Sequence, residues 1–270
     1  MDIGIVGYGT VGGATAEVLR RLGHPVYVWD VNPARMKAAG AEGFSPLTPD
    51  LSPEVVFVCV PEQTVPDTLA SMREWPLTVI RSTVPPGSTD RLSRELGRPL
   101  VFMPETLREA TALSDALNPP FILIGTHDEA QGQKVAQLFA PLLAPTTTVQ
   151  PIIAEMVKLT LNAYLHTLVS FWNEINEICE LAGVPSHVVG KLSTQDPRVS
   201  TYGATMHGQP VGGKCLPKDL FQLVAFAQEQ GYLPQLLQVV QTVNGNIAAR
   251  AQPAKEYPKS ARSPQLRIAG

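Results

Sequence analysis

The chain has 270 residues, of which 44% are hydrophobic and 17% are charged. This composition is typical of a folded, globular protein and is too apolar for an unfolded chain. The formal net charge is only −3, and no long basic cluster is present, so a surface for nucleic acid or an anionic membrane is not indicated. The length favours two domains over one, and we expect a small-molecule partner.

Export, membrane insertion and metal binding are all disfavoured by the sequence. The longest apolar runs, such as 55–60, are far shorter than the roughly 18 residues that a membrane helix needs. The amino terminus lacks the basic region and cleavage site of a signal peptide. Cys59, Cys179 and Cys215 lie far apart, without the spacing of metal ligands or of a disulfide framework. We therefore expect a cytoplasmic protein without a bound metal.

Short apolar runs alternate with helical patterns in the first half of the chain. The runs are 2–6, 25–30, 54–60, 77–83, 99–104 and 121–125. Near-continuous apolar strands that alternate with helices are typical of a parallel sheet covered on both faces. We therefore predict an α/β fold in which residues 1–148 form a Rossmann-like, doubly wound domain.

The pattern changes near Ala154, where almost thirty residues pass without proline or glycine until Gly183. This stretch predicts one long helix. A second helical stretch begins near Leu216, so residues 149–250 are predicted to form an all-helical second domain. Residues 251–270 are polar and punctuated by proline, and we expect a flexible tail.

The sequence GYGTVG at 7–12 matches the dinucleotide-binding fingerprint, because it follows a predicted strand and opens a helix. Gly7 allows the tight turn, Gly9 lets the backbone approach a pyrophosphate, and Gly12 lets the helix pack closely on the sheet. A plain glycine-rich turn would lack the strand, the helix and the later acid that are all present here. The predicted cofactor residues are Gly7, Tyr8, Gly9, Thr10, Val11, Gly12, Asp30, Arg35, Val60, Pro61, Thr83, Glu109 and Lys218.

Asp30 and Arg35 bear on the choice between NAD and NADP. Asp30 ends the second predicted strand, where its carboxylate can accept hydrogen bonds from the adenosine ribose and would repel a 2′-phosphate. Arg35 could instead favour that phosphate, or be a solvated helix residue. We expect NAD.

GGKCLPKD at 212–219 places Cys215 after two glycines, beside two lysines and at the start of a helical stretch. Cations and a helix amino terminus both stabilise a thiolate, which is the nucleophilic form. Cys59 and Cys179, in an apolar strand and on the long helix, are better explained as small packing residues. Cys215 is therefore the predicted nucleophile.

Three polar side chains of the long helix share one face, because Glu155, Lys158 and Asn162 are three and seven residues apart. Lysine and asparagine one turn apart can polarise a carbonyl or stabilise an alkoxide. A solvated helix face is the simpler alternative for these three residues taken alone.

Two segments follow predicted strands and so lie at the carboxyl edge of the sheet, where ligands bind in such folds. One is STVPPGST at 82–89, in which Thr83 is the candidate. The other is PETLRE at 104–109, in which Glu105 or Glu109 could activate water. The simpler alternatives are a turn fixed by proline for the first segment and acids at a helix amino terminus for the second.

These segments, together with NE at 173–174 and DPRV at 196–199, resemble in content and order the UDP-glucose/GDP-mannose dehydrogenase family. The resemblance covers residues 1 to about 250. It implies two successive NAD-dependent oxidations, with an aldehyde captured by the cysteine, oxidised to a thioester and hydrolysed. It also implies a homodimer formed through the long helix.

The resemblance implies roles for individual residues. Cys215 would be the nucleophile, Glu105 the water-activating acid, and Lys158, Asn162 and Asp219 the network that stabilises anions and water. Thr83, Glu109 and Lys218 would lie near nicotinamide and substrate, and Arg198 would reach a neighbouring active site unless it forms an ordinary surface ion pair. The predicted substrate residues are Glu105, Thr106, Leu107, Lys158, Asn162, Arg198, Gly212 and Gly213.

The chain departs from this family in ways that touch substrate recognition. Thr106 replaces an aromatic residue, the 207–213 loop differs from the usual form, and the third, nucleotide-gripping domain of the family is expected to be missing. We expect the substrate to be a primary alcohol, changed from UDP-glucose to a nucleotide-linked or smaller phosphorylated compound, with UDP-glucose itself as the alternative. The alternatives are a two-electron dehydrogenase of the 3-hydroxyacid or 6-phosphogluconate type and a non-catalytic NAD-binding partner.

Overall fold

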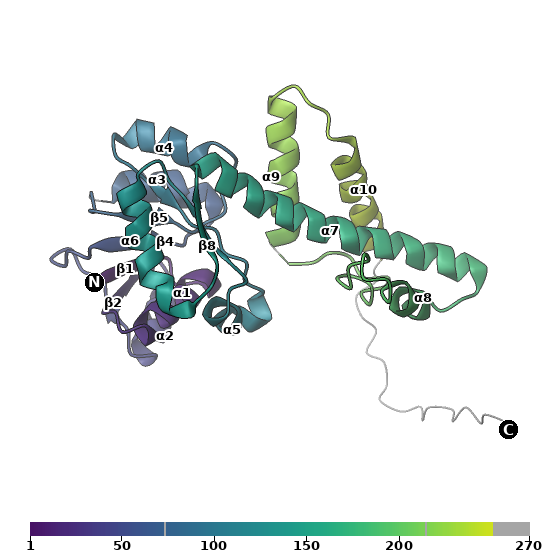
Figure 1. The fold of residues 1–270 in the computed structure, drawn as a ribbon, viewed down its shortest axis with the longest axis horizontal. Coiled ribbons are helices and arrows are strands. Elements are labelled where there is room, and N and C mark those ends of the chain that lie inside the picture. The colour runs from purple at the N-terminus through teal and green to yellow at the C-terminus, as the bar shows by residue number, and fades with distance from the viewer. Residues whose placement is uncertain (73, 214, 251–270) are drawn as a thin grey trace. The chain divides into compact units, whose positions relative to one another are not determined.

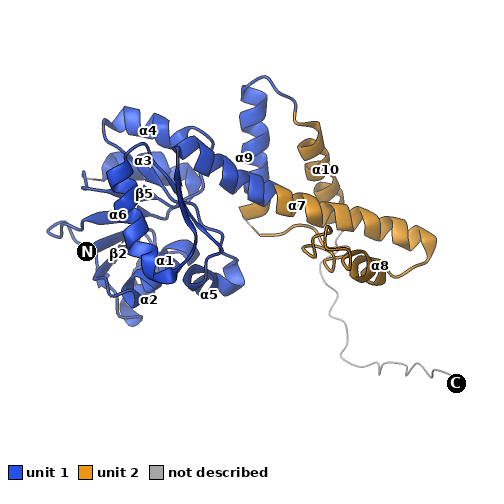
Figure 2. Cartoon of the chain, viewed as in Figure 1, with its two compact units in different colours: residues 1–163, 218–233 blue, residues 164–217, 234–270 orange. Residues whose placement is uncertain are grey.

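The computed structural model describes residues 1–72, 74–213 and 215–250. The tail predicted at 251–270 lies outside these described residues. The chain divides into two compact units (Figure 2). The first contains residues 1–163 and 218–233, and the second contains residues 164–217 together with the chain from Pro234 onward.

An eight-stranded sheet forms the centre of the first unit, in the order β3-β2-β1-β4-β5-β6-β7-β8 (Figure 1). Its order runs outward from β1 in both directions, as in a doubly wound fold. Every neighbouring pair is parallel except β6 and β7, which are antiparallel. The strands are β1 Ile3–Val6, β2 Val26–Trp29, β3 Ser45–Pro46, β4 Val55–Val58, β5 Thr78–Ile80, β6 Val101–Phe102, β7 Ile122–Gly125 and β8 Thr146–Val149.

Successive strand residues point alternately into two cores, one on each face of the sheet. Val79 and Val101 belong to the core shared with helices α1, α2 and α6, whereas Ile80 and Phe102 belong to the core shared with α3, α4 and the start of α7. The predicted Rossmann-like sheet, covered on both faces, is thereby confirmed. The helices of this unit are α1 Thr10–Arg21, α2 Pro33–Ala41, α3 Val65–Ser71, α4 Ser88–Leu96, α5 Ala112–Leu117 and α6 Glu129–Phe139.

The remaining helices are α7 Pro151–Ala182, α8 Ser186–Ser193, α9 Cys215–Glu229 and α10 Gln235–Arg250. Helix α7 has 32 residues, which confirms the predicted long helix. Proline at its first position costs no hydrogen bond, and it ends before Gly183, whose φ of 68° suits the left-handed position after a helix. No helix among the described residues is long and apolar enough to cross a membrane.

Candidate active site

The turn between β1 and α1 has the geometry that a dinucleotide requires. Gly7 has a φ of 94°, and a Cβ on Gly12 would collide with the carbonyl oxygen of Gly7. A Cβ on Gly9 would meet nothing closer than the Arg35 guanidinium at 3.7 Å. Gly7 and Gly12 therefore hold the turn and the close helix packing, while Gly9 leaves its backbone open to a ligand.

The amino terminus of α1 is suited to the phosphates of NAD. Its first turn contains no acidic residue, and in the described structure no side chain caps it. Its amide groups thus remain available as donors, and the helix dipole favours an anion at this end. Tyr8, Gly9 and Thr10 line a hollow of about 530 Å³ beside the turn, and Val11 and Gly12 continue into the helix.

Asp30 lies just after β2 and is held as an anion by its neighbours. Its carboxylate accepts hydrogen bonds from the amides of Tyr8 at 2.6 Å and Asn32 at 2.8 Å. Burial alone would raise the pKa of Asp30, but these bonds and Arg35 bring it below its usual value. Arg35 Nη1 lies 3.3 Å from Asp30 Oδ2, so Arg35 pairs with the acid instead of pointing freely into solvent.

The other predicted cofactor residues follow the strands β4, β5 and β6. Val60 and Thr83 are half-buried, whereas Pro61 and Glu109 are exposed. All lie beyond the carboxyl ends of parallel strands, the edge at which such folds bind ligands.

A buried ion pair joins α7 to the segment after β6. Lys158 Nζ donates to Glu105 Oε1 at 2.9 Å and to the Glu105 carbonyl oxygen at 2.8 Å. The second carboxylate oxygen of Glu105 accepts from the amide of Leu107 at 2.5 Å. The side chains of Lys158 and Glu105 are 5% and 9% exposed, so each charge depends on its partner. Thr106, between Glu105 and Leu107, is half-buried.

One turn further along α7, Asn162 Nδ2 donates to Asp219 Oδ2 at 2.5 Å. Lys218 Nζ contacts both Asp219 Oδ1, at 2.5 Å, and Glu62 Oε2, at 3.0 Å. Burial alone would lower the pKa of Lys218, but the two carboxylates raise it above its usual value. The structure thus brings together five predicted residues. Lys158 and Asn162 share one face of α7 and each meets a buried carboxylate, and Lys218 pairs with the second of these.

Cys215 is exposed at the first residue of α9. Asp219 follows it by four residues, so the two lie on one side of this helix. Gly212 and Gly213, before the helix, are exposed, and Gly213 has a φ of 73°. Arg198 forms an exposed ion pair with Asp196, with Nη2 and Oδ2 2.5 Å apart.

Sequence reasoning missed several contacts around these residues. Glu155 is fully buried, and its carboxylate accepts from the amides of Gly87 at 2.5 Å and Thr89 at 2.8 Å and from the Thr89 hydroxyl at 2.6 Å. It therefore fixes the start of α4 to α7. Glu62 as a partner of Lys218 and the bond from Tyr8 Oη to Glu42 at 2.6 Å were also missed. These partners lie far away in the sequence, and no local sequence pattern predicts such contacts.

The sequence matches two models of one family. Residues 62–143 match the NAD-binding domain of the UDP-glucose/GDP-mannose dehydrogenase family, and residues 153–246 match its central domain. Residues 2–86 also match a model of NADP oxidoreductases that depend on coenzyme F420, which covers the same strand, glycine turn and helix.

Known proteins agree with the family models. The chain is 29% identical to UDP-glucose 6-dehydrogenase of Haloferax volcanii, over 90% of this chain and 69% of that protein. It resembles the solved UDP-glucose dehydrogenase of Pyrobaculum islandicum with a TM-score of 0.80 and 25% identity, over 91% of this chain and 68% of that one. A 3-hydroxyisobutyrate dehydrogenase of Mycobacterium tuberculosis shares the fold, with a TM-score of 0.74 at 17% identity over 92% of this chain and 94% of that one.

The chain thus spans about two thirds of the length of the UDP-glucose dehydrogenases described above. Its glycine turn, free helix amino terminus and buried acid after β2 fit NAD, the cofactor of the matched amino-terminal domain. The chain belongs to the UDP-glucose/GDP-mannose dehydrogenase family.

Proposed function

We propose that this chain oxidises a primary alcohol to a carboxylic acid in two NAD-dependent steps, with Cys215 as a covalent nucleophile. The observation that carries this proposal is the pair of donors on α7, Lys158 and Asn162, each fixed by a buried carboxylate. NAD, when bound, supplies the hydride acceptor for both oxidations.

The fixed donors suit the charge that develops during oxidation and acyl transfer. Oxygen becomes an alkoxide when the alcohol is deprotonated, and again when a thiol or water adds to a carbonyl. The ammonium of Lys158 and the amide of Asn162 can donate to that oxygen without reorganising, because Glu105 and Asp219 hold them in place. Removing one such donor typically lowers kcat by about 100- to 1,000-fold.

Cys215 suits the covalent step because it is exposed and begins a helix. A helix amino terminus stabilises the thiolate. The thiolate sulfur adds to the aldehyde carbon, and loss of a second hydride leaves a thioester on Cys215. Glu105 then accepts a proton from water, hydroxide attacks the thioester carbon, and the carbon–sulfur bond breaks to release the acid and the thiolate.

The proposed substrate is a nucleotide-linked or phosphorylated primary alcohol. Two of the three relatives named above are UDP-glucose dehydrogenases, which supports a nucleotide-linked sugar. Thr106 and the 207–213 loop depart from the family pattern at positions assigned to the substrate, which supports a changed substrate. Leu107, Arg198, Gly212 and Gly213 are the remaining residues that we assign to it.

The test is release of NADH from a panel of sugar nucleotides, nucleotides and phosphorylated alcohols. The proposal expects two NADH per substrate consumed and no second NADH with Cys215→Ala. One NADH per substrate in the unmodified chain would favour the 3-hydroxyacid type of dehydrogenase. NAD binding without turnover of any compound would favour a non-catalytic partner.

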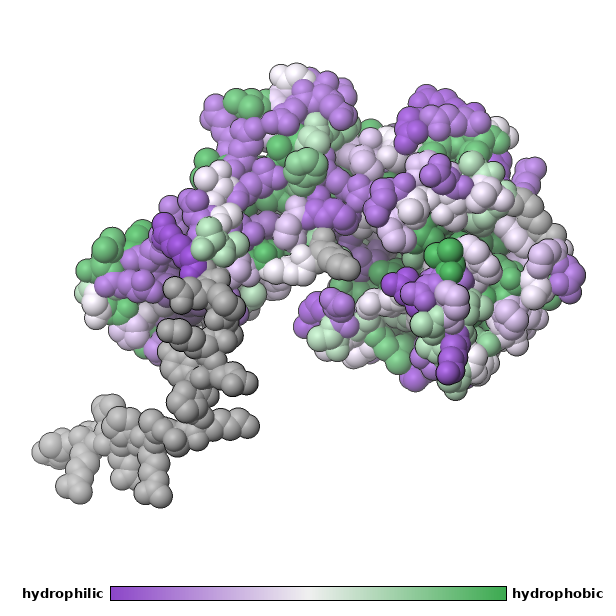
Figure 3. Space-filling model, turned by 180° about the vertical axis from the view of Figure 1, so that it is seen from behind, coloured by the Kyte–Doolittle hydropathy of each residue, from purple (hydrophilic) through white to green (hydrophobic). Residues whose placement is uncertain are grey.

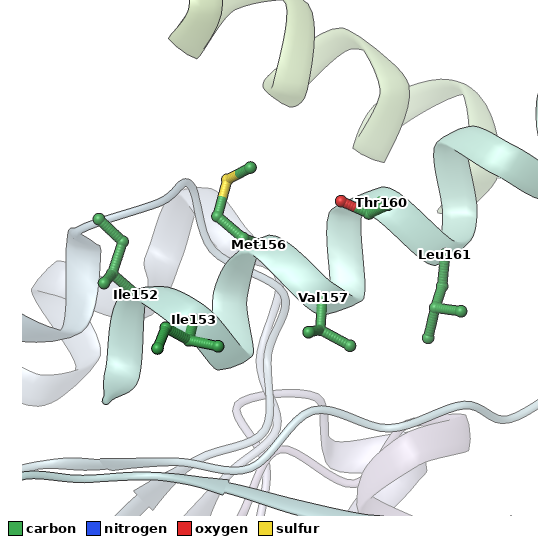
Figure 4. A pocket seen from close by; sticks show the side chains of 6 residues that line it. All are labelled: Ile152, Ile153, Met156, Val157, Thr160 and Leu161. Atoms are coloured by element: carbon green, nitrogen blue, oxygen red, sulfur yellow. The ribbon is translucent and has the colours of Figure 1, made fainter. Parts of the chain in front are cut away.

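A homodimer formed through α7 is part of this proposal. Tyr164, Phe171 and Ile178 are each about half exposed and repeat every seven residues, so they form one apolar stripe. Nearer its start, six residues of α7 line an apolar hollow of about 490 Å³, with Ile152, Met156 and Thr160 on one side of the helix in Figure 4 and Ile153, Val157 and Leu161 on the other.

The other end of α7 supports the same assembly. Hydrophobic atoms gather where α7 ends and α8 lies (Figure 3), at the exposed residues Leu181, Val184, Val188 and Leu192. Apolar surface of this kind usually marks an interface. Light scattering should give a molar mass twice that of one chain. Phe171→Glu should reduce this molar mass to that of one chain. The control variant Leu143→Glu, at an exposed residue of the first unit, should leave it unchanged. A monomeric unmodified chain would contradict the dimer.

A further inference from the structure

Arg81 occupies a position that the sheet normally gives to an apolar residue. Arg81 follows directly after β5, and its guanidinium lies over the ring of Phe139, a residue of the core beneath α1 and α6. Glu105, three residues after β6, lines the same cavity as Arg81 and Phe139. Arg81 is only 8% exposed. A charged side chain has therefore been placed at the carboxyl edge of the sheet, inside the protein.

The guanidinium of Arg81 is incompletely partnered. Its Nε and Nη1 are buried and have no hydrogen-bond acceptor in the part of the chain that the structure describes. Its carbon Cζ lies 6.0 Å from the centre of the Phe139 ring. Arg98 is equally buried at 8% but donates through Nη2 to the carbonyl oxygen of Leu69 at 2.7 Å. Arginine is rarely buried without hydrogen-bond partners, so we expect a bound ligand to accept hydrogen bonds from Nε and Nη1 of Arg81.

A small cavity is lined in part by Arg81. Arg81, Glu105 and Phe139 line it together with apolar side chains such as Met103 and Phe121, and its volume is about 30 Å³. That space holds roughly two water molecules, because one needs about 10–15 Å³ of this kind of volume. It is too small for a nicotinamide ring or a sugar. Water is also the ligand that can accept from a guanidinium and donate to a carboxylate at once.

We propose that this cavity binds water between Arg81 and Glu105, and that Arg81 is a positioning residue for the water that Glu105 activates. The water accepts a hydrogen bond from the guanidinium and donates one to the carboxylate, whose two oxygens also accept from Lys158 and the Leu107 amide. The role in hydrolysis rests on the proposed function. In that step one proton passes from water to Glu105, the carbon–oxygen bond forms and the carbon–sulfur bond to Cys215 breaks.

Diffraction from crystals of the full chain with NAD tests the water site directly. The inference expects ordered water within hydrogen-bonding distance of both Arg81 and Glu105, and its loss in Arg81→Met. A dry cavity in the unmodified chain, or a protein side chain that satisfies both guanidinium nitrogens, would overturn it.

A kinetic experiment tests the role of that water, with NAD and, as the probe, UDP-glucose or whichever compound of the panel above releases NADH. Thioester on Cys215 is followed by rapid quenching and mass spectrometry. We expect the thioester to persist roughly 10- to 100-fold longer in Arg81→Met, with partial recovery in Arg81→Lys and no change in the matched variant Arg98→Met. Equal lifetimes in Arg81→Met and the unmodified chain, or equal slowing in Arg98→Met, would overturn the positioning role. Absence of thioester in every form, including the unmodified chain, with every compound of the panel would instead overturn the proposed function and the role of Arg81 with it.

Discussion

The ammonium of Lys158 donates to two oxygens of the same residue, the Glu105 carboxylate at 2.9 Å and the Glu105 main-chain carbonyl at 2.8 Å. This double contact fixes both the side chain and the backbone of Glu105 against α7. Since both side chains are buried, neither can move without exposing an unpaired charge to the protein interior. The proposed water-activating base, Glu105, and the proposed oxyanion donor, Lys158, therefore fix each other in position.

Lys158→Met should lower the free energy of unfolding by about 3–5 kcal/mol, because it leaves the Glu105 carboxylate buried without its cation. Urea unfolding measures this loss. Combining Lys158→Met with Glu105→Gln should cost less than the sum of the two single changes, because the second change removes the stranded charge. Strictly additive losses would show that the two groups do not depend on each other.

Gly12→Ala should disrupt both folding and NAD binding, since the added Cβ collides with the carbonyl of Gly7. A loss of about 1–3 kcal/mol in the free energy of unfolding is expected from such overpacking. Gly13→Ala is the matched control, because its Cβ would lie 3.8 Å from Tyr8, an ordinary contact. Alanine there should raise stability by up to about 1 kcal/mol. NAD titration followed by fluorescence should separate the two variants, and unchanged affinity in Gly12→Ala would be evidence against the glycine-turn site.

Asp30 should make the free energy of unfolding depend on pH in the acidic range. Its pKa is lowered in the folded chain, because the hydrogen bonds from Asn32 and Tyr8, together with Arg35, outweigh the opposing effect of burial. The stabilisation is therefore fully present above the unfolded-state pKa, about 3.9, and is lost as pH falls through the lower folded-state value. The difference in free energy of unfolding between the unmodified chain and Asp30→Asn should be constant from about pH 7 to 5 and shrink below about pH 4. A difference that does not vary with pH would contradict this assignment.

Cys215 should react with iodoacetamide before the other two cysteines. It is exposed, whereas Cys179 is buried and Cys59 is half-buried with its pKa raised by burial to about 12. Peptide mass spectrometry of briefly treated protein locates the label, and NADH formation should fall in proportion to labelling of Cys215. Modification of Cys215 without loss of activity would exclude it as the nucleophile.

Much of the sheet was predictable because five of its strands, β1 and β4 to β7, are buried on both faces and appear as continuous apolar runs. Strand β8 escaped because its sequence, Thr146–Val149, is polar and mostly exposed at the edge of the sheet. The direction of β7 could not be read either, since a run such as Ile122–Gly125 has the same pattern in a parallel or an antiparallel strand. The division of function at residues 148 and 250 stays a prediction.

The glycine turn was predictable because its chemistry is local in sequence. The partners of buried charges were not, because Lys158 meets Glu105 across 53 positions and Glu155 meets Thr89 across 66. Arg81 lies inside the predicted run 77–83 but was not singled out, since its burial depends on how Phe139 of α6 packs against it. The spacing along the helix placed Lys158 and Asn162 on one face, but it could not predict which residues of other elements contact them.

The central claim is that Cys215 carries the substrate as a thioester, and intact mass measurement of Glu105→Gln tests it most directly. This variant should oxidise the substrate but hydrolyse the thioester slowly, so incubation with NAD and a compound that yields NADH should add the mass of the acyl group. Peptide mapping should place that mass on Cys215. Turnover by the unmodified chain together with an unmodified Cys215 in the variant, at every time sampled, would contradict the account.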